Sequence, residues 1–334
     1  MNILVTGSAG YVGSVCAAEL VNQKHRVIGY DNLSAGHREA LVRGVKFIQG
    51  DLADTRRLKR VCKRNRIEGV MHFAATTLVA ESMSNPHLFY QNNVTATIAL
   101  LEVLLECKIR RMVFSSSAAV YGDPQRTPIR EEHPTLPVNP YGESKLAVER
   151  ALAWYHRAYG LNCVALRYFN AAGATDRLGE DHRPETHLLP RLLEAAMNPD
   201  KGFSIYGEDY PTPDGTCVRD FIHVRDIAHA HILALQFFTN VYFRTYNVGH
   251  GKGYSVREVI KTVEEVTGRR LAISVGPRRP GDPAVLVASP RKICRELTWY
   301  PRWSDLKTIV TSAWAWKLRH PCGYASRLNN QYSL

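Results

Sequence analysis

The stretch "VTGSAGYVGS" (residues 5–14) places Gly7, Gly10 and Gly13 between the apolar run "NILVTG" and a segment with a helical pattern. The spacing is G-x-x-G-x-x-G, one residue longer in its first gap than the ordinary dinucleotide fingerprint. A tight turn after a strand requires glycine, a bare backbone lets a pyrophosphate approach, and the following helix N-terminus attracts its negative charge. The stretch therefore predicts a dinucleotide-binding turn at the start of an α/β domain.

A carboxylate follows at the spacing that such a turn requires. The second apolar run ends in "GYDN", so that Asp31 comes 18 residues (31 − 13) after Gly13. A carboxylate at this point accepts hydrogen bonds from the adenosine ribose and repels a 2′-phosphate. We therefore expect NAD rather than NADP. A glycine-rich turn without a ligand is the alternative, and the combined strand, turn, helix and carboxylate argue against it.

The first half of the chain alternates apolar runs with helical patterns. Six runs read as buried parallel strands: "NILVTG", "RVIGYD", "VKFIQGD", "GVMHFA", "RMVFSSS" and "CVALRYF". Helical patterns lie between them near 12–23, 54–65, 86–107 and 141–159. This alternation predicts an α/β fold, a Rossmann-type doubly wound parallel sheet with a smaller C-terminal α/β substrate lobe.

The domain organisation follows from a change in pattern near residue 176. We expect an NAD-binding domain over 1–176, a smaller, loop-rich α/β lobe over 177–321 and a loosely held tail over 322–334. The loops "DRLGEDHRPET" and "GEDYPTPDGT" are polar and rich in turn residues, as binding loops often are. Helices are predicted at 186–197, 224–238, 255–267 and 304–319.

Composition bounds the function classes. The chain has 334 residues, is 45% hydrophobic and carries a net charge of +12. Part of the excess lies in "RRLKRVCKRNR" (56–66), which has no interleaved aromatic residues, so we expect a solvated helix face rather than a nucleic-acid surface. The seven cysteines are scattered without a C-x-x-C pair, and no leader or membrane span is evident. We expect a cytoplasmic protein with no metal site.

Several longer motifs carry a family resemblance. With the glycine turn, "GDLAD", "HFAA", "FSSSAAVYG" and "PYGESK" occur in the order of the extended short-chain dehydrogenase/reductase family, which the chain resembles. The later "LRYFNAAGA", "DYPTPDGTCVRDFIHVRDIA", "YNVGHG" and "PRRPGDPAVL" are similar to those of its UDP-glucose (UDP-galactose) 4-epimerases. The resemblance runs from residue 1 to about 321.

The resemblance implies a tightly bound NAD and a set of residues that contact it. Beyond the turn and Asp31 it assigns residues at the pyrophosphate, the ribose, the adenine and the nicotinamide end. They are Gly7, Gly10, Tyr11, Val12, Gly13, Asp31, Asn32, Leu33, Ser34, Ala35, Gly36, Asp51, Leu52, Phe73, Ala74, Ala75, Thr77, Asn92, Ser117, Tyr141, Lys145 and Phe169. Some bacterial members have lysine at the position of Thr77.

The same resemblance gives "NPYGESK" (139–145) a catalytic role. Asn139 can cap a helix and Pro140 suits its first turn, so Tyr141 and Lys145 stand one turn apart on one face. In the family the tyrosine removes the proton of the sugar 4-hydroxyl, the lysine holds the nicotinamide ribose, and Ser117 binds the reacting hydroxyl. A free phenol has a pKa of about 10, so the lysine, the nicotinium ring and the helix N-terminus would have to lower it.

A UDP-hexose is the implied substrate, oxidised at C4, rotated as the 4-ketose and reduced again. The resemblance places ten residues on it: Ser117, Tyr141, Asn170, His187, Leu188, Tyr206, Arg219, Arg279, Asp282 and Leu286. It also implies a homodimer that pairs the helices near 86–107 and 141–159. Three histidines, His223, His229 and His231, are expected to make structural contacts, and Cys217 to be packed.

Other functions stay open at this point. A 4-epimerase for UDP-N-acetylhexosamine, UDP-glucuronate or a UDP-pentose fits the same motifs. A 4,6-dehydratase fits less well, because it places Asp-Glu after the position of Ser117, where this chain has Ala118 and Ala119. A non-catalytic NAD-sensing or RNA-binding relative would have no need of an intact Ser117, Tyr141 and Lys145.

Overall fold

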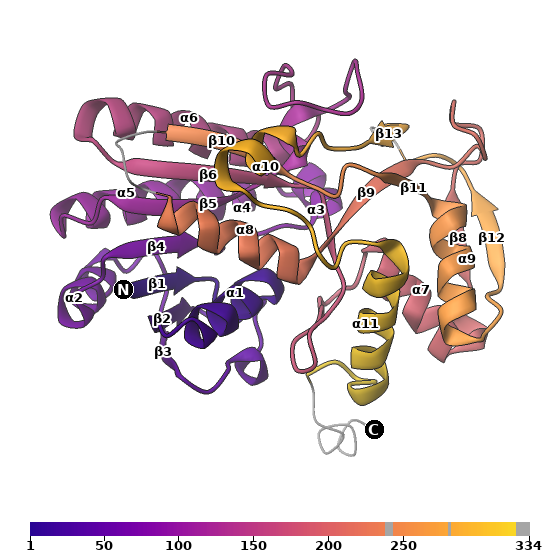
Figure 1. The fold of residues 1–334 in the computed structure, drawn as a ribbon, viewed down its shortest axis with the longest axis horizontal. Coiled ribbons are helices and arrows are strands. Elements are labelled where there is room, and N and C mark those ends of the chain that lie inside the picture. The colour runs from indigo at the N-terminus through magenta and orange to yellow at the C-terminus, as the bar shows by residue number, and fades with distance from the viewer. Residues whose placement is uncertain (238–242, 280–281, 325–334) are drawn as a thin grey trace.

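The computed structural model describes residues 1–237, 243–279 and 282–324. Its largest element is a seven-stranded sheet in the order β10-β6-β5-β4-β1-β2-β3, in which all neighbouring strands are parallel (Figure 1). The strands are β1 Asn2–Thr6, β2 Arg26–Asp31, β3 Val45–Gln49, β4 Gly69–His72, β5 Arg111–Ser117, β6 Asn162–Tyr168 and β10 Phe243–Val248. The six strands expected from the apolar runs are confirmed, and the strand order reverses between β1 and β4.

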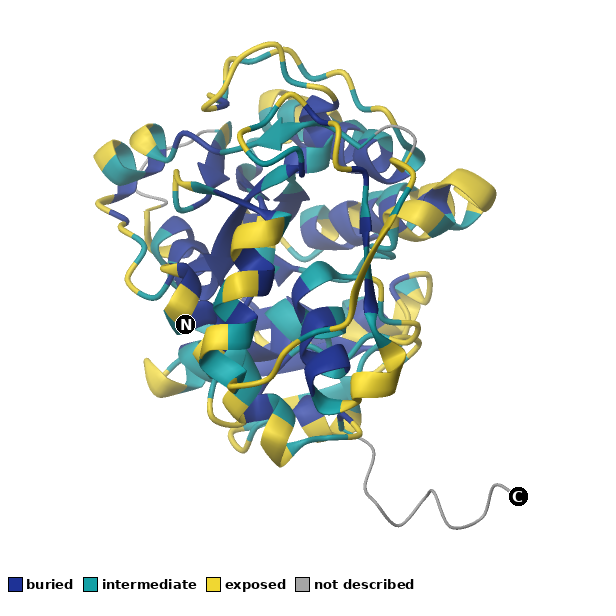
Figure 2. Cartoon of the chain, turned by 90° about the vertical axis from the view of Figure 1, so that its right-hand side faces the viewer, coloured by how far each residue is buried: buried dark blue, intermediate teal, exposed yellow. Residues whose placement is uncertain are grey.

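Helices cover both faces of this sheet. They are α1 Tyr11–Asn22, α2 Thr55–Asn65, α3 Val79–Ser84, α4 Pro86–Phe89, the π-helical turn Tyr90–Thr95, α5 Ala96–Glu106, α6 Pro140–Tyr159 and α8 Val224–Gln236, with 3₁₀ turns at Arg38–Ala40 and Ala118–Tyr121. Side chains alternate along a strand, so Ile3 and Val5 join the core under α1 and α8, while Leu4 joins the core under α2, α5 and α6. Figure 2 shows the strands buried at the centre and the outer helix faces exposed.

The second half of the chain returns to this sheet. α8 packs against α1, and β10 extends the sheet beside β6. Both segments lie beyond residue 176, in the part that the sequence analysis assigned to the substrate lobe. The division at residue 176 stays a prediction. In the structure, the seven-stranded sheet and its helices form the first lobe, and this lobe includes α8 and β10 as well.

The remaining elements form the second lobe, drawn at the right of Figure 1. They are β7 Asn170–Ala172, α7 Leu188–Met197, the 3₁₀ turn Pro199–Lys201, β8 Phe203–Tyr206, β9 Val218–His223, β11 Gly253–Ser255, α9 Val256–Thr267, β12 Ile273–Gly276, β13 Val285–Leu286 and α11 Leu306–Arg319. The helix α10 Arg291–Leu297 packs against β10 and joins the core of the first lobe instead. The four predicted helices are confirmed. The short strands and α10 were missed, because two to seven residues give too little periodicity to detect.

The chain end is partly fixed. Tyr324 donates its backbone N–H to Asp181 Oδ2 (2.8 Å), and its ring lies 5.4 Å from that of Trp316. Residues 322–324 are therefore held against the molecule, whereas the tail was expected to be loose. The rest of the predicted tail, 325–334, lies outside the described residues.

One helical run is long and apolar enough to cross a membrane by length and composition. It is Pro86–Glu106, with a mean hydropathy of 1.2 over its best window. A core helix of a soluble protein passes the same test, and Leu100, Leu101 and Leu104 of this run are fully buried against the sheet. The run is weak evidence for a membrane protein.

Candidate active site

The glycine turn lies at the reversal of strand order, at the carboxyl ends of β1 and β4. Gly7 has φ +70°, and a Cβ on it would lie 2.5 Å from the backbone nitrogen of Ala74 in the segment after β4. A Cβ on Gly13 would lie 2.1 Å from the carbonyl oxygen of Gly7. α1 begins after Gly10 without a side-chain cap, so its first N–H groups are open to an anion. The turn fits a pyrophosphate.

Asp31, predicted to bind the ribose, is held in place at the end of β2. Its Oδ2 accepts from the Ala9 N–H (2.9 Å) and its Oδ1 from the Leu33 N–H (2.8 Å). The loop 31–36 then folds onto the glycine turn, because a Cβ on Gly36 would lie 2.8 Å from the Ala9 carbonyl carbon. Each carboxylate oxygen keeps a lone pair for a ribose hydroxyl. The predicted preference for NAD has a matching geometry here.

The residues predicted to contact the adenine of NAD follow the next strand of the sheet, β3. Asp51 follows β3, and its Oδ2 accepts from Asn32 Nδ2 (2.8 Å) across the loop after β2. Leu52 is buried beside it, with 7% of its surface exposed. This hydrogen bond joins the loops after β2 and β3, and the contact of Asp51 and Leu52 with the adenine stays a prediction.

The segment after β4 is held by an asparagine that the sequence analysis missed. Asn93 Oδ1 accepts from the Thr76 N–H (2.8 Å), while its Nδ2 donates to the Thr76 carbonyl (3.0 Å) and to Ser144 Oγ (2.9 Å). Its predicted neighbour Asn92 donates to Thr76 Oγ1 (3.0 Å). Both lie in the π-helical turn, a feature that often marks functional sites. Asn93 thereby couples the segment containing Phe73–Thr77 to the catalytic helix α6.

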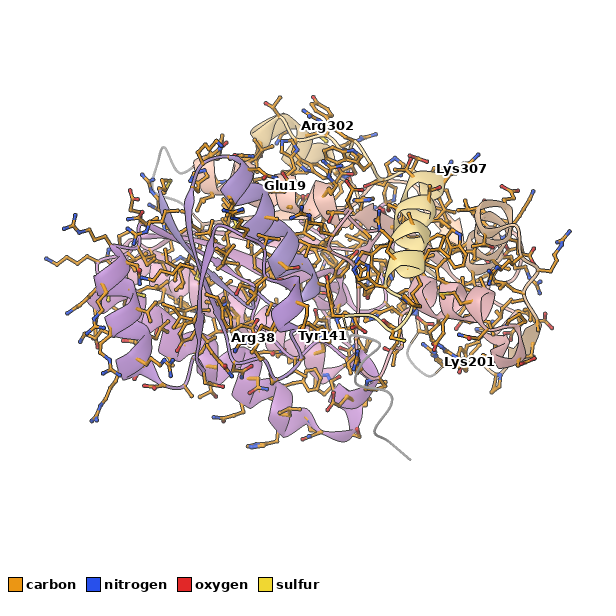
Figure 3. The ribbon with its side chains drawn as sticks, turned by 90° about the horizontal axis from the view of Figure 1, so that it is seen from below. Glu19, Arg38, Tyr141, Lys201, Arg302 and Lys307 are labelled. Atoms are coloured by element: carbon orange, nitrogen blue, oxygen red, sulfur yellow. The ribbon has the colours of Figure 1, made fainter. Side chains whose placement is uncertain are left out.

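The predicted catalytic residues meet at the carboxyl end of β5. α6 begins as the sequence indicated: Asn139 Oδ1 accepts from the Gly142 N–H (2.8 Å), and Pro140 occupies the first turn. Tyr141 lies close to Ser117, the last residue of β5, whose side chain acts to lower the pKa of the phenol. Lys145 Nζ donates to the Ser115 carbonyl (3.0 Å) and lies 5.8 Å from the Tyr141 ring centroid. Figure 3 labels Tyr141 between Arg38 of the first lobe and Lys201 of the second.

Burial dominates the electrostatics of this group. Burial raises the pKa of Tyr141 above 10, and the hydrogen bond with Ser117 offsets this only in part. Burial also lowers the pKa of Lys145 to about 7, with Glu149 acting in the opposite direction. The described residues by themselves therefore keep the phenol protonated. The predicted activation of Tyr141 needs a further positive charge, and the nicotinamide ring of NAD carries one.

Four of the predicted substrate residues in the second lobe form two contacting pairs. Arg219 on β9 forms an ion pair and a hydrogen bond with Asp282, and both are largely buried. Arg279 lies over the ring of Tyr206 at 4.0 Å from its centroid. Hydrogen bonds from Arg191, and then from Arg279, lower the pKa of Tyr206. Arg191 on α7 was not singled out from the sequence; its position in "LLPRLLEAA" gives no motif signal.

The other substrate candidates lie between these groups. Leu286 on β13 pairs in register with Arg219 and packs on a small core that contains Phe169 and Ala118, the residue after Ser117. Asn170 is exposed at the start of β7. Leu286 therefore lies between Arg219, which is predicted to bind the diphosphate, and the segment that follows Ser117.

His187 and Leu188 lie where the loop after β7 meets α7. His187 Nδ1 is 2.8 Å from Glu185 Oε1 and 3.0 Å from Glu180 Oε1. Although burial lowers it, these carboxylates raise the pKa of His187 to about 10. Two of the three histidines expected to make structural contacts do so: His223 accepts from the Arg225 N–H, and His231 Nδ1 bonds the Ile227 carbonyl. The third, His229, has a buried Nδ1 that forms no hydrogen bond among the described residues.

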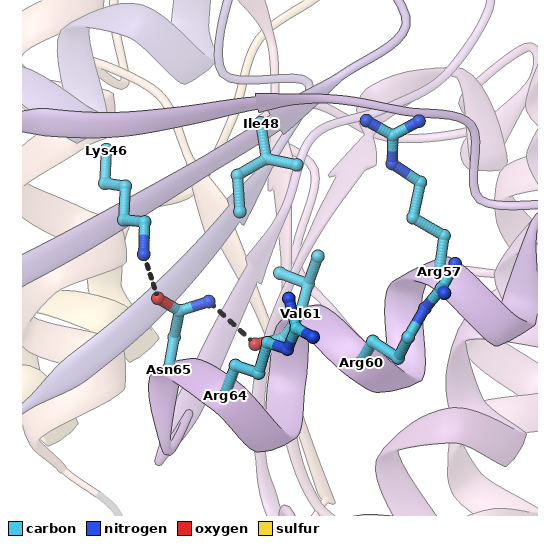
Figure 4. Close-up of a pocket in the computed structure, with 7 residues that line it drawn as sticks. All are labelled: Lys46, Ile48, Arg57, Arg60, Val61, Arg64 and Asn65. Atoms are coloured by element: carbon cyan, nitrogen blue, oxygen red, sulfur yellow. Dashed lines mark hydrogen bonds between the residues drawn. The ribbon is translucent and has the colours of Figure 1, made fainter.

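A cavity of about 290 Å³ lies away from all these residues (Figure 4). It is formed by β3 and α2, and its lining includes Lys46, Arg57, Arg60 and Arg64. Leu58, Val61 and Cys62 form the buried side of α2, which confirms the predicted solvated helix with a basic outer face. None of the residues predicted for the cofactor or the substrate lines this cavity, so we do not include it in the site.

Comparisons with known proteins identify the family. Residues 3–249 match the NAD-dependent epimerase/dehydratase family. The chain belongs to this family. The UDP-glucose 4-epimerase of Halalkalibacterium halodurans is 47% identical, and the match covers 98% of each chain.

Solved structures of the NAD-dependent epimerase/dehydratase family share the fold. The UDP-glucose 4-epimerase of Brucella ovis, in complex with NAD, has a TM-score of 0.91 and 44% identity, covering 94% of this chain and 97% of that one. That of Bifidobacterium longum, in complex with NAD⁺ and UDP, has a TM-score of 0.92 and 38% identity, covering 97% and 100%. The Rossmann-type fold and the use of NAD, both predicted from the sequence, are confirmed.

Proposed function

We propose that this chain interconverts UDP-glucose and UDP-galactose by oxidising C4 to a 4-keto sugar, which rotates and is reduced on its opposite face. The observation that carries the proposal is the meeting of Tyr141 and Lys145 at the end of β5: Lys145 Nζ lies 5.8 Å from the Tyr141 ring centroid and donates to the Ser115 carbonyl (3.0 Å), at the same edge of the sheet as a turn that fits a pyrophosphate. The names of relatives with 38–47% identity over nearly the whole chain support the same reaction.

The chain's own residues have distinct roles in this proposal. NAD, when bound, supplies the hydride acceptor and donor. Ser117 orients the 4-hydroxyl, and Tyr141 takes its proton and later returns it. Lys145 is the nearest cation to the phenol among the residues described above, and its ammonium favours the phenolate. Because the two are buried, their charges act in a medium that screens them weakly.

Binding of the uridine diphosphate part of the substrate is the second part of the proposal. Arg219 and Arg279 neutralise the diphosphate, Tyr206 neighbours the uracil, and Asp282 accepts from the uridine ribose. Asn170, His187 and Leu188 line the region of the diphosphate and hexose. Arg219 already pairs with Asp282, so a diphosphate would share the guanidinium, whose forked donors can serve two anions.

A homodimer and a cytoplasmic location complete the proposal. α6 carries the exposed aromatic side chains Trp154 (65% exposed) and Tyr159 (53%), and Tyr90 (42%) precedes α5. Apolar side chains left exposed on two adjacent helices support a helix-pairing interface between copies. The domain division 1–176, 177–321 and 322–334 is retained as a proposal about sequence segments.

The test of the function is Tyr141→Phe, with Tyr300→Phe as a matched control. Tyr300 is 58% exposed, and the structure places it outside the site. Tyr141→Phe should lower kcat for UDP-galactose conversion by several powers of ten and retain NAD, because only the proton acceptor is lost. Tyr300→Phe should behave as the unchanged chain. Near-normal turnover by Tyr141→Phe would refute the assignment.

A further inference from the structure

The loop between β7 and α7 repeats one pair of residue types. In "EDHRPETH" (180–187) Glu180 precedes His182, and Glu185 precedes His187, each by two residues. All four side chains turn toward one point, so that one ligand atom from each lies within 4.8 Å of the others. We call these four residues the Glu/His cluster. The sequence analysis considered cysteines and the histidines of 223–231 as metal ligands and did not consider this loop.

The separations within the Glu/His cluster match those of a tetrahedral metal site. Glu180 Oε1 lies 3.2 Å from His182 Nδ1 and 3.0 Å from His187 Nδ1. Glu185 lies 2.8 Å from His187 Nδ1 through Oε1, and 3.9 Å from His182 Nδ1 through Oε2. Ligands about 2.0–2.1 Å from a zinc ion are about 3.3 Å apart at the corners of a tetrahedron. The four distances bracket this value, so small side-chain movements would complete the geometry.

A second observation concerns His182. Its Nδ1 is buried and forms no hydrogen bond within the described part of the chain, although it is directed at the two carboxylates. Buried polar atoms in proteins almost always have a partner. The two carboxylates are sheltered, with 10% of Glu180 and 16% of Glu185 exposed, whereas 25% of His182 and 42% of His187 is exposed. The cluster therefore offers a metal ion sheltered carboxylates and an imidazole nitrogen that forms no hydrogen bond within the described part of the chain.

The loop is held from outside the cluster, which lowers the cost of arranging the ligands. The Gly179 N–H donates to Tyr324 Oη (3.0 Å), and Asp181 Oδ2 accepts from the Tyr324 N–H (2.8 Å). On the other side His37 Nε2, next to the ribose loop, contacts the Asp181 carbonyl (2.9 Å). These bonds fix the backbone on both sides of Glu180. A preformed site binds more tightly than one that must be ordered first.

Charge favours a divalent cation at this point. Two carboxylates bring two negative charges into a sheltered cluster, and they can be balanced by protons on both imidazoles or by one divalent ion. Two imidazole nitrogens and two carboxylate oxygens form a ligand set that suits zinc and disfavours magnesium, which prefers oxygen ligands and six-fold coordination.

We propose that Glu180, His182, Glu185 and His187 bind one zinc ion or a similar divalent transition-metal ion. The ion ties the loop between the lobes to the start of α7, next to residues proposed for the substrate. Coordination through Nδ1 leaves Nε2 of His187 as an N–H donor, which is compatible with its proposed place near the diphosphate. The site is separate from the chemistry at Tyr141, so the ion has a positioning role.

The experiment measures zinc binding by the full-length holoenzyme without a histidine tag. After dialysis against a chelator, the protein is titrated with ZnCl₂ by calorimetry, and the zinc retained per chain is measured by plasma mass spectrometry. The variants are His182→Gln and Glu185→Gln, and the control is His87→Gln, which removes an exposed imidazole on α4. CoCl₂ reports the geometry through the intense visible absorption of tetrahedral cobalt, and MgCl₂ serves as the hard-cation comparison.

The unchanged chain and His87→Gln should each bind one zinc ion and gain thermal stability from it. Each cluster variant should lose at least about tenfold in zinc affinity together with the stabilisation, since a ligand is lost. If either cluster variant fails to fold, the other gives the comparison. Two results would overturn the proposal: equal zinc binding by all four proteins, or no zinc binding by the unchanged chain. Either would show that hydrogen bonds alone, without a metal ion, join the carboxylates and imidazoles of the cluster. UDP-galactose conversion is assayed separately, so loss of the metal proposal leaves the proposed function standing.

Discussion

Replacing Lys145 by methionine should abolish most of the activity and at the same time stabilise the fold of the chain freed of NAD. Lys145 is 2% exposed, and its burial lowers the pKa of its ammonium to about 7. Methionine has a similar length and a good helix propensity, so it can occupy the same space in α6 without a charge.

The size of the gain follows from that pKa. The difference between 10.5 in the unfolded chain and about 7 in the folded chain corresponds to about 5 kcal/mol, at about 1.4 kcal/mol for each factor of ten. The variant loses the hydrogen bond from Nζ to the Ser115 carbonyl, which costs about 1–2 kcal/mol. The net expectation is a gain of about 3 kcal/mol in the free energy of unfolding near neutral pH.

The gain should depend on pH in one direction. Between pH 7 and 10.5 the unfolded chain binds the lysine proton while the folded chain has released it, so the stability of the unchanged chain rises with pH in this window. Below pH 7 both states are charged and the full cost of burial is present. The difference between Lys145→Met and the unchanged chain should therefore be largest at pH 6–7 and shrink toward pH 10.

Urea unfolding of both proteins, followed by far-ultraviolet circular dichroism at pH 6, 7, 8, 9 and 10, measures this difference. Other groups titrate equally in the two proteins and cancel in the subtraction. A difference that is constant across the pH range would refute the reasoning, because it would mean that the lysine keeps its ordinary pKa in the folded chain. A less stable variant at every pH would show that packing and the lost hydrogen bond outweigh the buried charge.

Three further predictions test the cofactor and substrate sites. Asp31→Ala should weaken NAD binding and relax the exclusion of NADP, since the repelling carboxylate is gone; unchanged discrimination in affinity measurements on stripped protein would place the ribose elsewhere. Gly13→Ala should reduce the NAD retained on purification by more than about tenfold, because its Cβ would lie 2.1 Å from a backbone oxygen; full retention in the absorbance spectrum would contradict the turn geometry. The unchanged chain should prefer UDP-glucose and UDP-galactose, with weak activity on the N-acetylhexosamine pair; Leu286→Tyr should remove that activity and Leu286→Gly raise it, by about 1–3 kcal/mol in kcat/KM discrimination. A constant ratio across the three proteins would show that Leu286 does not border the 2-substituent.

Local patterns were sufficient for much of the site. The glycine turn was recognisable because two of its restrictions are local: Gly7 has a positive φ, and a Cβ on Gly13 would meet the Gly7 carbonyl oxygen. The close approach of Gly7 to Ala74 after β4, in contrast, comes from the tertiary fold. The cap at Asn139 and the pairing of Tyr141 with Lys145 are likewise local, since a helix places residues four apart on one face. Buried parallel strands were visible because burial on both faces requires continuous apolar runs.

Other features depended on contacts between distant segments. Asn93 has no local signature; it matters because the fold brings Thr76 and Ser144 to its amide. In the sequence, Arg191 is an ordinary arginine on an amphipathic helix. Only the fold places it beside Tyr206 and Arg279. The return of β10 to the edge of the first sheet could not be read from six residues whose partner strand, β6, lies 75 residues or more earlier in the chain.

The sequence by itself determined the fold class and the use of NAD, because apolar strands and a glycine turn are fixed by restrictions on neighbouring residues. It also predicted Asp31 as the carboxylate that selects NAD, and, through the family resemblance, Tyr141 and Lys145 as the catalytic pair. Only the tertiary structure decided the electrostatic state of that pair and the convergence of the Glu/His cluster. A pKa depends on how completely water is excluded by segments that are distant in sequence, and for Tyr141 and Lys145 this exclusion opposes the charged forms that the sequence argument assumed. The four ligand atoms of the cluster likewise meet only because His37 and Tyr324, from opposite ends of the chain, hold the loop between them.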